Sequence, residues 1–291
     1  MSRIPRTFLA QDPSACRPDQ ASVVLVPVPY DATTSSQPGA RGGPEAILNA
    51  SLQLEEYDME LEALPLDVGI HVDQAVEPDL SAPGATVDQV RRVCDEWLAR
   101  GKFVIVLGGE HSVAVGAGWA AADHFGEVSF LQIDAHMDLR DSYQGSPFSH
   151  ACTARRLWER GRVVAVGIRN ASAEEASWAR RQDATIVTAQ RIAQSPDDSW
   201  MDEVMASLSD RVYVTFDIDG LDSSLAPATG TPEPGGLGYW QTLRLLRRLA
   251  REKTVVGADL CELAPMPGQY ASSYLAASIV YKMVGYFVAE R

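Results

Sequence analysis

The chain lacks the features that mark membrane, secreted and nucleotide-binding proteins. Among its 291 residues, no apolar run approaches the roughly 18 consecutive residues that a membrane span requires. Residues 1–20 contain no apolar core like that of a signal peptide, so we expect a cytoplasmic protein. The glycine-rich stretch GGEHSVAVGAG lacks the G-x-G-x-x-G order and no Walker lysine follows a glycine loop, so nucleotide binding is not indicated.

Cysteine is also scarce. The four cysteines lie far apart and form no C-x-x-C pair: Cys16, Cys94, Cys152 and Cys261. This spacing argues against a disulfide framework and against a zinc knuckle. We interpret all four as ordinary reduced thiols.

Basic residues are outnumbered, with 25 Lys and Arg against 39 Asp and Glu and a net charge of −14. Binding to nucleic-acid phosphates requires basic patches, so we expect no nucleic-acid partner. The same charge favours the approach of a small cation, although many proteins are acidic for solubility alone.

Short apolar, β-branched runs alternate with helical patterns along the chain. The runs are 22–28, 103–107, 128–133, 163–168, 212–218 and 254–260, and the helical patterns include 86–101, 174–182 and 239–252. Strands that are apolar throughout belong to parallel sheets covered on both faces. We therefore predict an α/β fold: one three-layer α/β/α domain with a mainly parallel sheet. Without repeats or a linker, residues 1–291 form this single domain, with 1–21 as an amino-terminal extension.

Acids and histidines follow four of the predicted strands. They are His111 in GGEHS, then Asp134, His136 and Asp138 in DAHMD, then Asp217 and Asp219 in FDIDG, and Glu262 in DLCEL. Ligands of open parallel sheets bind at the carboxyl ends of the strands, so these side chains are expected at one edge. The acids and histidine of DAHMD are spaced by two, which in an extended backbone directs them to one side.

Simpler interpretations of DAHMD have to be weighed first. Asp and His near a strand end often serve only as turn formers or solvated polar residues. A calcium loop also spaces acids by two, but counted from Asp134 its glycine position holds Leu139 and its closing glutamate position holds Gly145. The partners behind the other strands favour a site over either alternative.

Several carboxylates close together in a partly buried pocket require cations, because like charges repel strongly at low dielectric. Oxygen-rich ligation with two imidazoles and no thiolate suits Mn²⁺ first, with Mg²⁺, Fe²⁺ and Zn²⁺ left open. Six ligands exceed one tetrahedral zinc site and suit two ions roughly 3.5–4 Å apart. Such a pair lowers the pKa of a water between them, so we expect metal-assisted hydrolysis.

Three motifs resemble those of a known family, the ureohydrolases of the arginase and agmatinase superfamily. They are GGEHS at 108–112, DAHMD at 134–138 and FDIDGLDSSLAPATGTPEPGGL at 216–237. The segment PYDATTSSQPGARGGPEAIL at 29–48 is similar to the agmatinase form of this region. Together the matches cover most of the chain from about residue 22.

The resemblance implies two Mn²⁺ per subunit. One ion would be held by His111, Asp134, Asp138 and Asp217, and the other by Asp134, His136, Asp217 and Asp219. Asp134 and Asp217 would then bridge the two ions.

The resemblance also implies a catalytic and substrate-binding group of His150, Asp138 and Glu262. Glu262 matches the carboxylate that receives the substrate's guanidinium, for which a planar bidentate acceptor is suited. His150, in SPFSHA, matches the histidine that shuttles protons, a task that suits a pKa near neutrality.

Among possible substrates, the sequence favours agmatine, which would be cleaved to putrescine and urea. The Gly-Asn-Leu-His-Gly pattern by which arginases recognise an amino-acid head is absent, and Ser-His-Ala and Pro-Gly-Ala-Arg are similar to agmatinases. N1-aminopropylagmatine, guanidinobutyrate and arginine remain alternatives. By resemblance we expect a homo-oligomer, a hexamer or a trimer.

Two rival functions are a binuclear metallophosphoesterase and a non-catalytic metal-binding protein. The first also needs Gly-Asn-His and Gly-His-x-His segments, which the chain lacks with only five histidines. The second would normally have lost a ligand, and all six are present. His71 and His124 are interpreted as structural or surface residues, and Cys152 and Cys261 as packing beside the site.

Overall fold

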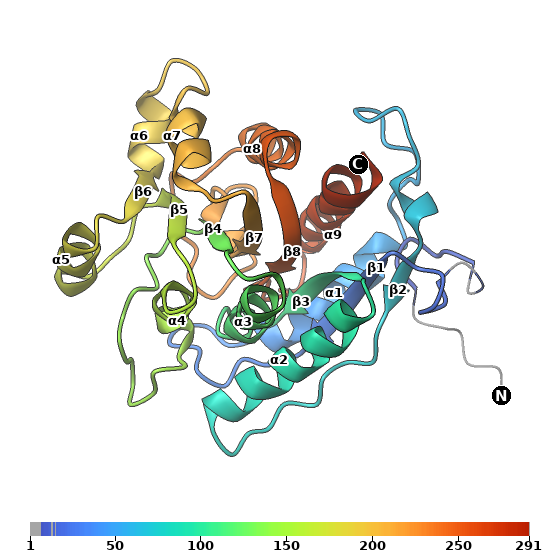
Figure 1. Cartoon of the computed structure of the whole chain (residues 1–291), viewed down its shortest axis with the longest axis horizontal. Helices are drawn as coiled ribbons and strands as arrows, with labels where there is room; N and C mark the ends of the chain where they lie inside the picture. Colours follow the sequence, from blue (N-terminus) through green and yellow to red (C-terminus); the bar gives the residue numbers. More distant parts are fainter. Residues whose placement is uncertain (1–6, 13, 15, 291) are drawn as a thin grey trace.

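Eight parallel strands form one sheet in the computed structural model, which describes residues 7–12, 14 and 16–290 (Figure 1). The strands are β1 Val23–Val28, β2 Ile70–Val72, β3 Phe103–Gly108, β4 Ser129–Ile133, β5 Val163–Ile168, β6 Thr185–Thr188, β7 Arg211–Phe216 and β8 Thr254–Leu260. Their order is β2-β1-β3-β8-β7-β4-β5-β6, and every pairing between them is parallel. The predicted α/β fold with a mainly parallel sheet is confirmed.

Helices cover both faces of this sheet, which gives the predicted three layers (Figure 1). One face packs against α2 Pro83–Ala99, α3 Val113–Phe125, α4 Thr153–Trp158 and α5 Ala173–Arg181. The other packs against α1 Gly43–Ser51, α6 Ala189–Gln194, α7 Trp200–Ser207, α8 Tyr239–Glu252 and α9 Tyr270–Val284.

The alternation of side chains along each strand explains why the strands are apolar throughout. In β1, Val23 and Leu25 join the core beneath α1 and α9, while Val24 and Val26 join the core beneath α2 and α3. Successive side chains of a strand point to opposite faces, so a strand covered on both sides has no position for a solvated residue.

The boundaries depart from the sequence prediction in several places. Strands β2 and β6 were not predicted, because three or four residues at the sheet edges give too short a pattern. The run predicted at 212–218 ends as a strand at Phe216, and the acids after it enter the 3-10 turn Ile218–Gly220. The glycine-rich stretch after β3 begins α3, where a Cβ on Gly116 would lie 2.3 Å from the Val87 oxygen of α2.

The predicted amino-terminal extension, residues 1–21, includes positions 1–6, 13 and 15, which lie outside the described residues. Within its described part, Phe8 is fully buried against Tyr281, and Gln11 donates a hydrogen bond to the Leu66 carbonyl. These contacts attach the segment to the domain. No helix in the described part of the chain is long and apolar enough to cross a membrane.

The four strands that carry the predicted site residues are neighbours at the centre of the sheet, in the order β3-β8-β7-β4. All four are parallel, so their carboxyl ends meet at one edge. The segments that follow them bring His111, Glu262, Asp217 and Asp134 to this edge.

Candidate active site

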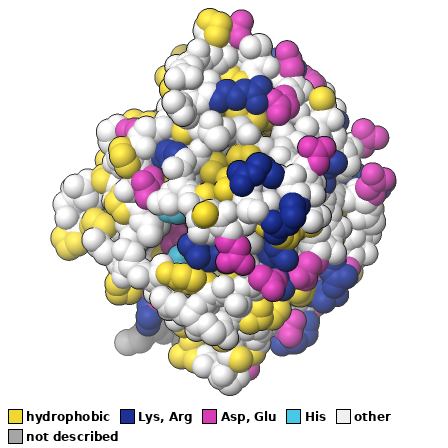
Figure 2. All heavy atoms as spheres, turned by 90° about the vertical axis from the view of Figure 1, so that its left-hand side faces the viewer, with side chains coloured by type: hydrophobic (Ala, Val, Ile, Leu, Met, Phe, Trp, Pro, Cys, Tyr) yellow, Lys and Arg dark blue, Asp and Glu magenta, His cyan; other side chains and the backbone are white. Residues whose placement is uncertain are grey.

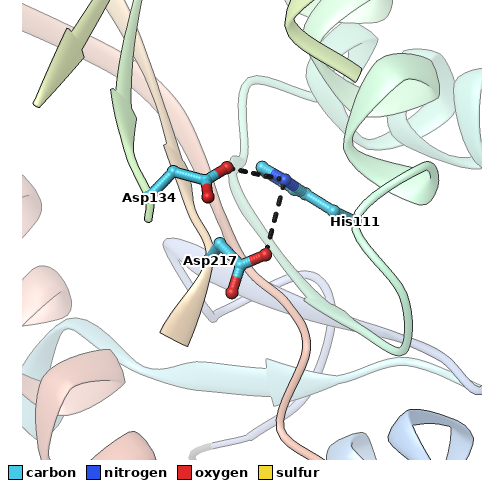
Figure 3. A group of neighbouring side chains, drawn as sticks. All are labelled: His111, Asp134 and Asp217. Atoms are coloured by element: carbon cyan, nitrogen blue, oxygen red, sulfur yellow. Dashed lines mark ion pairs between the residues drawn. The ribbon is translucent and has the colours of Figure 1, made fainter. Parts of the chain in front are cut away.

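Two overlapping groups of acids and histidines lie at the carboxyl edge of the central strands. His111, Asp134 and Asp217 form one group, and Asp134, His136 and Asp219 form the other, with the potential ligand atoms of each group within 4.8 Å of one another. Figure 3 shows the first group, with the His111 ring facing the carboxylates of Asp134 and Asp217. Asp134 belongs to both groups, as a bridging ligand would.

His111 is fully buried and directs Nδ1 towards three carboxylates. This nitrogen lies 3.3 Å from Asp134 Oδ2, 3.0 Å from Asp138 Oδ2 and 3.7 Å from Asp217 Oδ2. Asp138 therefore stands beside the first group, although it is not one of its three members.

The other nitrogen of His111 is fixed by a buried polar pair. Nε2 lies 2.8 Å from Thr215 Oγ1, and the Thr215 hydroxyl donates to Asp259 Oδ1 at 3.1 Å. Because the single hydroxyl proton goes to Asp259, Thr215 accepts from the Nε2–H of His111. This arrangement leaves Nδ1 as the nitrogen that can bind a metal, as expected for an oriented histidine ligand.

His136 belongs to the second group and lies near the Asp134 oxygen that His111 does not approach. Its Nδ1 lies 3.0 Å from Asp219 Oδ2 and 3.7 Å from Asp134 Oδ1. Asp219 is held by the backbone N–H of Ala135 and by the hydroxyl of Thr231. These bonds fix the Asp219 carboxylate beside the imidazole.

The first acid of each pair spaced by two accepts a hydrogen bond from the backbone two residues on. The N–H of His136 donates to Asp134 Oδ1 at 2.6 Å, and the N–H of Asp219 donates in the same way to Asp217 Oδ1 at 2.8 Å. Aspartate readily accepts such a bond from a residue two positions on. Asp138 has φ 49°, in the left-handed region, and reaches His111 from this bent segment.

Burial and mutual repulsion dominate the electrostatics of these acids. Burial raises the pKa of Asp217 well above its usual range, and the charges of Asp219 and Asp134 raise it further. Burial, followed by the charge of Asp134, also raises the pKa of Asp138 to about 7. Burial lowers the pKa of His136, but its bond to Asp219 and the nearby acids outweigh this effect and raise it to about 10. The cluster therefore requires positive charge, which protons or metal ions can supply.

A cavity of about 170 Å³ opens beside the cluster. Its lining includes His136, Asp138, His150, Asp217 and Arg140. Figure 2 shows histidine and acidic side chains together in a recess on this face of the molecule.

His150 lies on the wall of this cavity, outside both groups. Its N–H donates to Thr33 Oγ1 at 3.0 Å, and its Nε2 lies 3.0 Å from Ser35 Oγ. Burial and the charges of His111 and His136 lower its pKa to about 4, below the near-neutral pKa expected from the sequence, so the imidazole is neutral near pH 7. A neutral imidazole facing a cavity can accept a proton.

Glu262 is buried directly behind His111. Its Oε1 accepts the backbone N–H of His111 at 2.7 Å, and its φ of 66° is in the left-handed region. Burial and the charge of Glu110 raise its pKa to about 8. Glu262 is not among the residues that line the cavity, so the structure places it beside the cluster at the end of β8.

Several residues around the site were missed in the sequence. Gln132 donates to Asp134 Oδ2 at 2.8 Å, and Thr215 and Asp259 orient His111. A signal existed, because these three polar side chains interrupt strands that are otherwise apolar. Glu110, in the GGEHS motif, accepts hydrogen bonds from the backbone N–H of Thr33 and the hydroxyl of Ser112.

The histidines and the cysteine to which the sequence assigned no metal or catalytic role lie outside both groups. His71 bonds to the Cys16 carbonyl and contacts Trp97, and His124 contacts Phe125. Among the described residues, neither histidine belongs to a candidate metal group. Cys261 is fully buried beside Asp259, to which its thiol donates at 3.6 Å.

The fold and the two groups define an α/β protein with a candidate two-metal centre at the carboxyl edge of its sheet. The chain belongs to the arginase family, whose family model matches residues 21–285. The resemblance to the ureohydrolase superfamily is thereby confirmed.

Two curated relatives and one solved structure illustrate the similarity. The N(1)-aminopropylagmatine ureohydrolase of Synechocystis sp. is 40% identical over 97% of this chain and 94% of its own length. The agmatinase of Pyrococcus horikoshii is 36% identical over 91% of this chain and 92% of its own length. The agmatine ureohydrolase structure of Thermoplasma volcanium has a TM-score of 0.85 and 32% identity, covering 93% of this chain and 91% of that one. These relatives confirm the expectation of a hydrolase of the agmatinase type.

Proposed function

We propose that this protein is a binuclear metal-dependent ureohydrolase that releases urea from agmatine or a closely related guanidino compound. The observation that carries the proposal is the pair of acid and histidine groups that share Asp134 at the carboxyl edge of an arginase-family sheet. The buried carboxylate of Glu262 beside them offers an acceptor for the guanidinium group.

The donor set fits two divalent ions. His111, Asp134, Asp138 and Asp217 would hold one ion, and Asp134, His136, Asp217 and Asp219 the other. All are oxygen or imidazole donors, which suits Mn²⁺. Ions held there supply positive charge that acidifies water and stabilises negative charge that develops during hydrolysis.

The side chains of the chain would orient the substrate and move its protons. Glu262 accepts N–H bonds of the guanidinium, which fixes the guanidinium carbon beside the cluster. Attack by the oxygen of a water on this carbon and cleavage of its bond to the tail nitrogen yield urea and the amine. His150, neutral at the cavity wall, takes up a proton and delivers it to the leaving nitrogen.

N1-aminopropylagmatine is the second candidate substrate. Four curated relatives named for that substrate are 38–43% identical to this chain, and four agmatinases are 33–36% identical. Both substrates carry the same guanidino group on a cationic tail, so the chemistry described above applies to either.

A urea-release assay on manganese-treated protein tests the proposal. Agmatine, N1-aminopropylagmatine, guanidinobutyrate and arginine are compared in parallel by kcat/KM. We expect turnover of the first two and little of the others, with loss of turnover after chelation. Absence of urea from all four would reject the function, and a preference for arginine would reject the substrate.

The proposed enzyme is a homo-oligomer, for which exposed aromatic residues offer a surface. Tyr270 and Tyr274 are 55% and 38% exposed, and their ring centroids lie 6.2 Å apart. Leu52, which is 44% exposed, precedes Gln53, whose carbonyl accepts a hydrogen bond from the Tyr274 hydroxyl. Light scattering that gave a monomer at micromolar concentration would contradict this part of the proposal.

A further inference from the structure

A second carboxylate, Glu233, is not itself among the residues that line the cavity but contacts two residues that are. Glu233 Oε1 lies 3.9 Å from His136 Nε2 and accepts a 2.5 Å hydrogen bond from Asn170 Nδ2. His136 and Asn170 both line the cavity. Since His136 Nδ1 faces Asp219, the Glu233 carboxylate lies one imidazole ring beyond the cluster.

The backbone that carries Glu233 is held tightly. The guanidinium of Arg169 donates to the carbonyl oxygens of Glu233 at 2.8 Å, Pro234 at 3.0 Å and Asp219, which is itself part of the cluster. One side chain thus fixes the segment that carries Glu233 relative to the candidate metal ligands. A carboxylate positioned in this way can discriminate between bound molecules by their length and charge.

No Lys or Arg in the described part of the chain forms an ion pair with the Glu233 carboxylate. Within the described part of the chain, its only ion-pair contact within 4 Å is His136, and its Oε2 accepts no hydrogen bond. Arg140, the arginine of the cavity lining, instead faces Glu175 at 3.7 Å and lies 4.9 Å from the centre of the Tyr143 ring. Glu233 is 31% exposed at its side chain, so a ligand can reach it.

We infer that Glu233 is a specificity-determining residue that binds the ammonium of the substrate's tail, an inference that rests on the proposed function. A guanidinium held at Glu262 directs its tail outward through the cavity, where the free oxygen of Glu233 accepts the N–H groups of the ammonium. The same carboxylate repels a tail that ends in a carboxylate, which disfavours guanidinobutyrate and arginine.

The test compares tails of similar length and different charge. Manganese-treated wild-type protein and Glu233→Gln are assayed by kcat/KM with agmatine, with the uncharged-tail analogue butylguanidine and with guanidinobutyrate. We expect Glu233→Gln to lower kcat/KM for agmatine about tenfold, because one charge-assisted contact is lost, and to leave butylguanidine nearly unchanged. Glu233→Lys should lower kcat/KM for agmatine further and should raise kcat/KM for guanidinobutyrate relative to that for agmatine.

Glu127→Gln is the matched control, since Glu127 is exposed just before β4, at the opposite edge of the sheet, and should leave all ratios unchanged. An unchanged ratio of agmatine to butylguanidine in Glu233→Gln would overturn the inference. An equal loss of kcat/KM for agmatine and butylguanidine, together with a loss of bound manganese, would also overturn it. Such a result would mean that Glu233 only positions His136. If the wild type releases no urea at all, the proposed function fails, and calorimetric binding of agmatine to wild type and Glu233→Gln still decides whether the contact exists.

Discussion

Asp134 is the residue on which the candidate site depends most. Its Oδ2 accepts from Gln132 and faces His111, and its Oδ1 accepts from the His136 backbone. Both oxygens thus have fixed directions before any ion binds, which lowers the entropy lost on binding. The cost of this arrangement is repulsion from neighbouring acids, which only cations relieve.

Asp217→Asn is expected to abolish most activity and to weaken metal retention. Asp217 stands 3.7 Å from His111 Nδ1, and as a proposed bridging ligand it would serve both ions. The loss in metal affinity should exceed the 10–100-fold that is typical of residues outside the ligand set. Metal content after gel filtration and kcat/KM are measured, with Asp210→Asn, exposed just before β7, as the control. Near-normal turnover with two bound ions would contradict the assignment.

Glu262→Gln should separate substrate binding from metal binding. The amide keeps an acceptor for the His111 N–H but loses the charge that pairs with a guanidinium. We expect KM for guanidino substrates to rise by about tenfold or more, with metal content intact. Steady-state kinetics and metal analysis of the same sample provide the two readouts. Loss of metal in this variant would instead make Glu262 a ligand.

At the scale of elements, the loop after β3 and the segment after β1 are joined backbone to backbone. The N–H of Gly109 donates to the Val28 carbonyl and that of Glu110 donates to the Tyr30 carbonyl. The Glu110 carboxylate then accepts the N–H of Thr33, whose hydroxyl accepts from His150. The position of His150 therefore depends on contacts between two loops that are far apart in the sequence.

Gly109→Ala is expected to disrupt this junction. A Cβ at Gly109 would lie 2.0 Å from the Tyr30 carbonyl oxygen, so the backbone would have to shift. We expect the free energy of unfolding to fall by about 2 kcal/mol or more, and kcat to fall because His150 loses its anchor. Urea denaturation and kinetics test this expectation. Gly238→Ala, where the Cβ would meet only the end of the Gln241 side chain at 3.4 Å, should be nearly neutral.

The long apolar strands were predictable, because each is buried on both faces and carries no competing pattern. The order of the strands was not, since β3 pairs with β8 across about half of the chain and the sequence holds no mark of that pairing. The positions of His111, Asp134 and Asp217 were also predictable, because these residues directly follow apolar runs that were recognised as strands. The bent backbone at Asp138 was not, because its left-handed conformation depends on tertiary contacts.

At the scale of the whole molecule, the sheet brings together acidic residues that lie far apart in the sequence. The four central strands deliver buried acids to one edge, so part of the net charge of −14 is concentrated at a single site. The residues that we propose to bind the substrate's tail were not predicted, since Glu233 and Asn170 follow different strands and meet only in the fold. Their distance in sequence left no pattern to interpret.

The concentration of buried acids predicts how stability depends on pH and metal. Burial and the charge of Asp134 raise the pKa of Asp138 from 3.8 to about 7, and burial and Glu110 raise that of Glu262 from 4.5 to about 8. The metal-free folded protein therefore holds protons that the unfolded chain has already released, and loses this stabilisation as pH rises through these values. The pKa of His136, raised from 6.5 to about 10, acts in the same direction at higher pH. The pKa of His150, lowered from 6.5 to about 4, opposes the effect only below about pH 6.5.

The Tm of chelated protein should consequently fall between about pH 5 and pH 9, while added Mn²⁺ replaces the protons and restores stability. The Tm difference between the two samples should grow with pH and reach about 5 °C or more when the metal is at 100 times its Kd. Differential scanning fluorimetry across this range measures both curves. Glu262→Gln lacks one of the titrating groups, so its chelated form should lose less stability as pH rises. A metal-dependent Tm difference that is constant or shrinks with pH would show that the cluster is not held together by exchange of protons for ions.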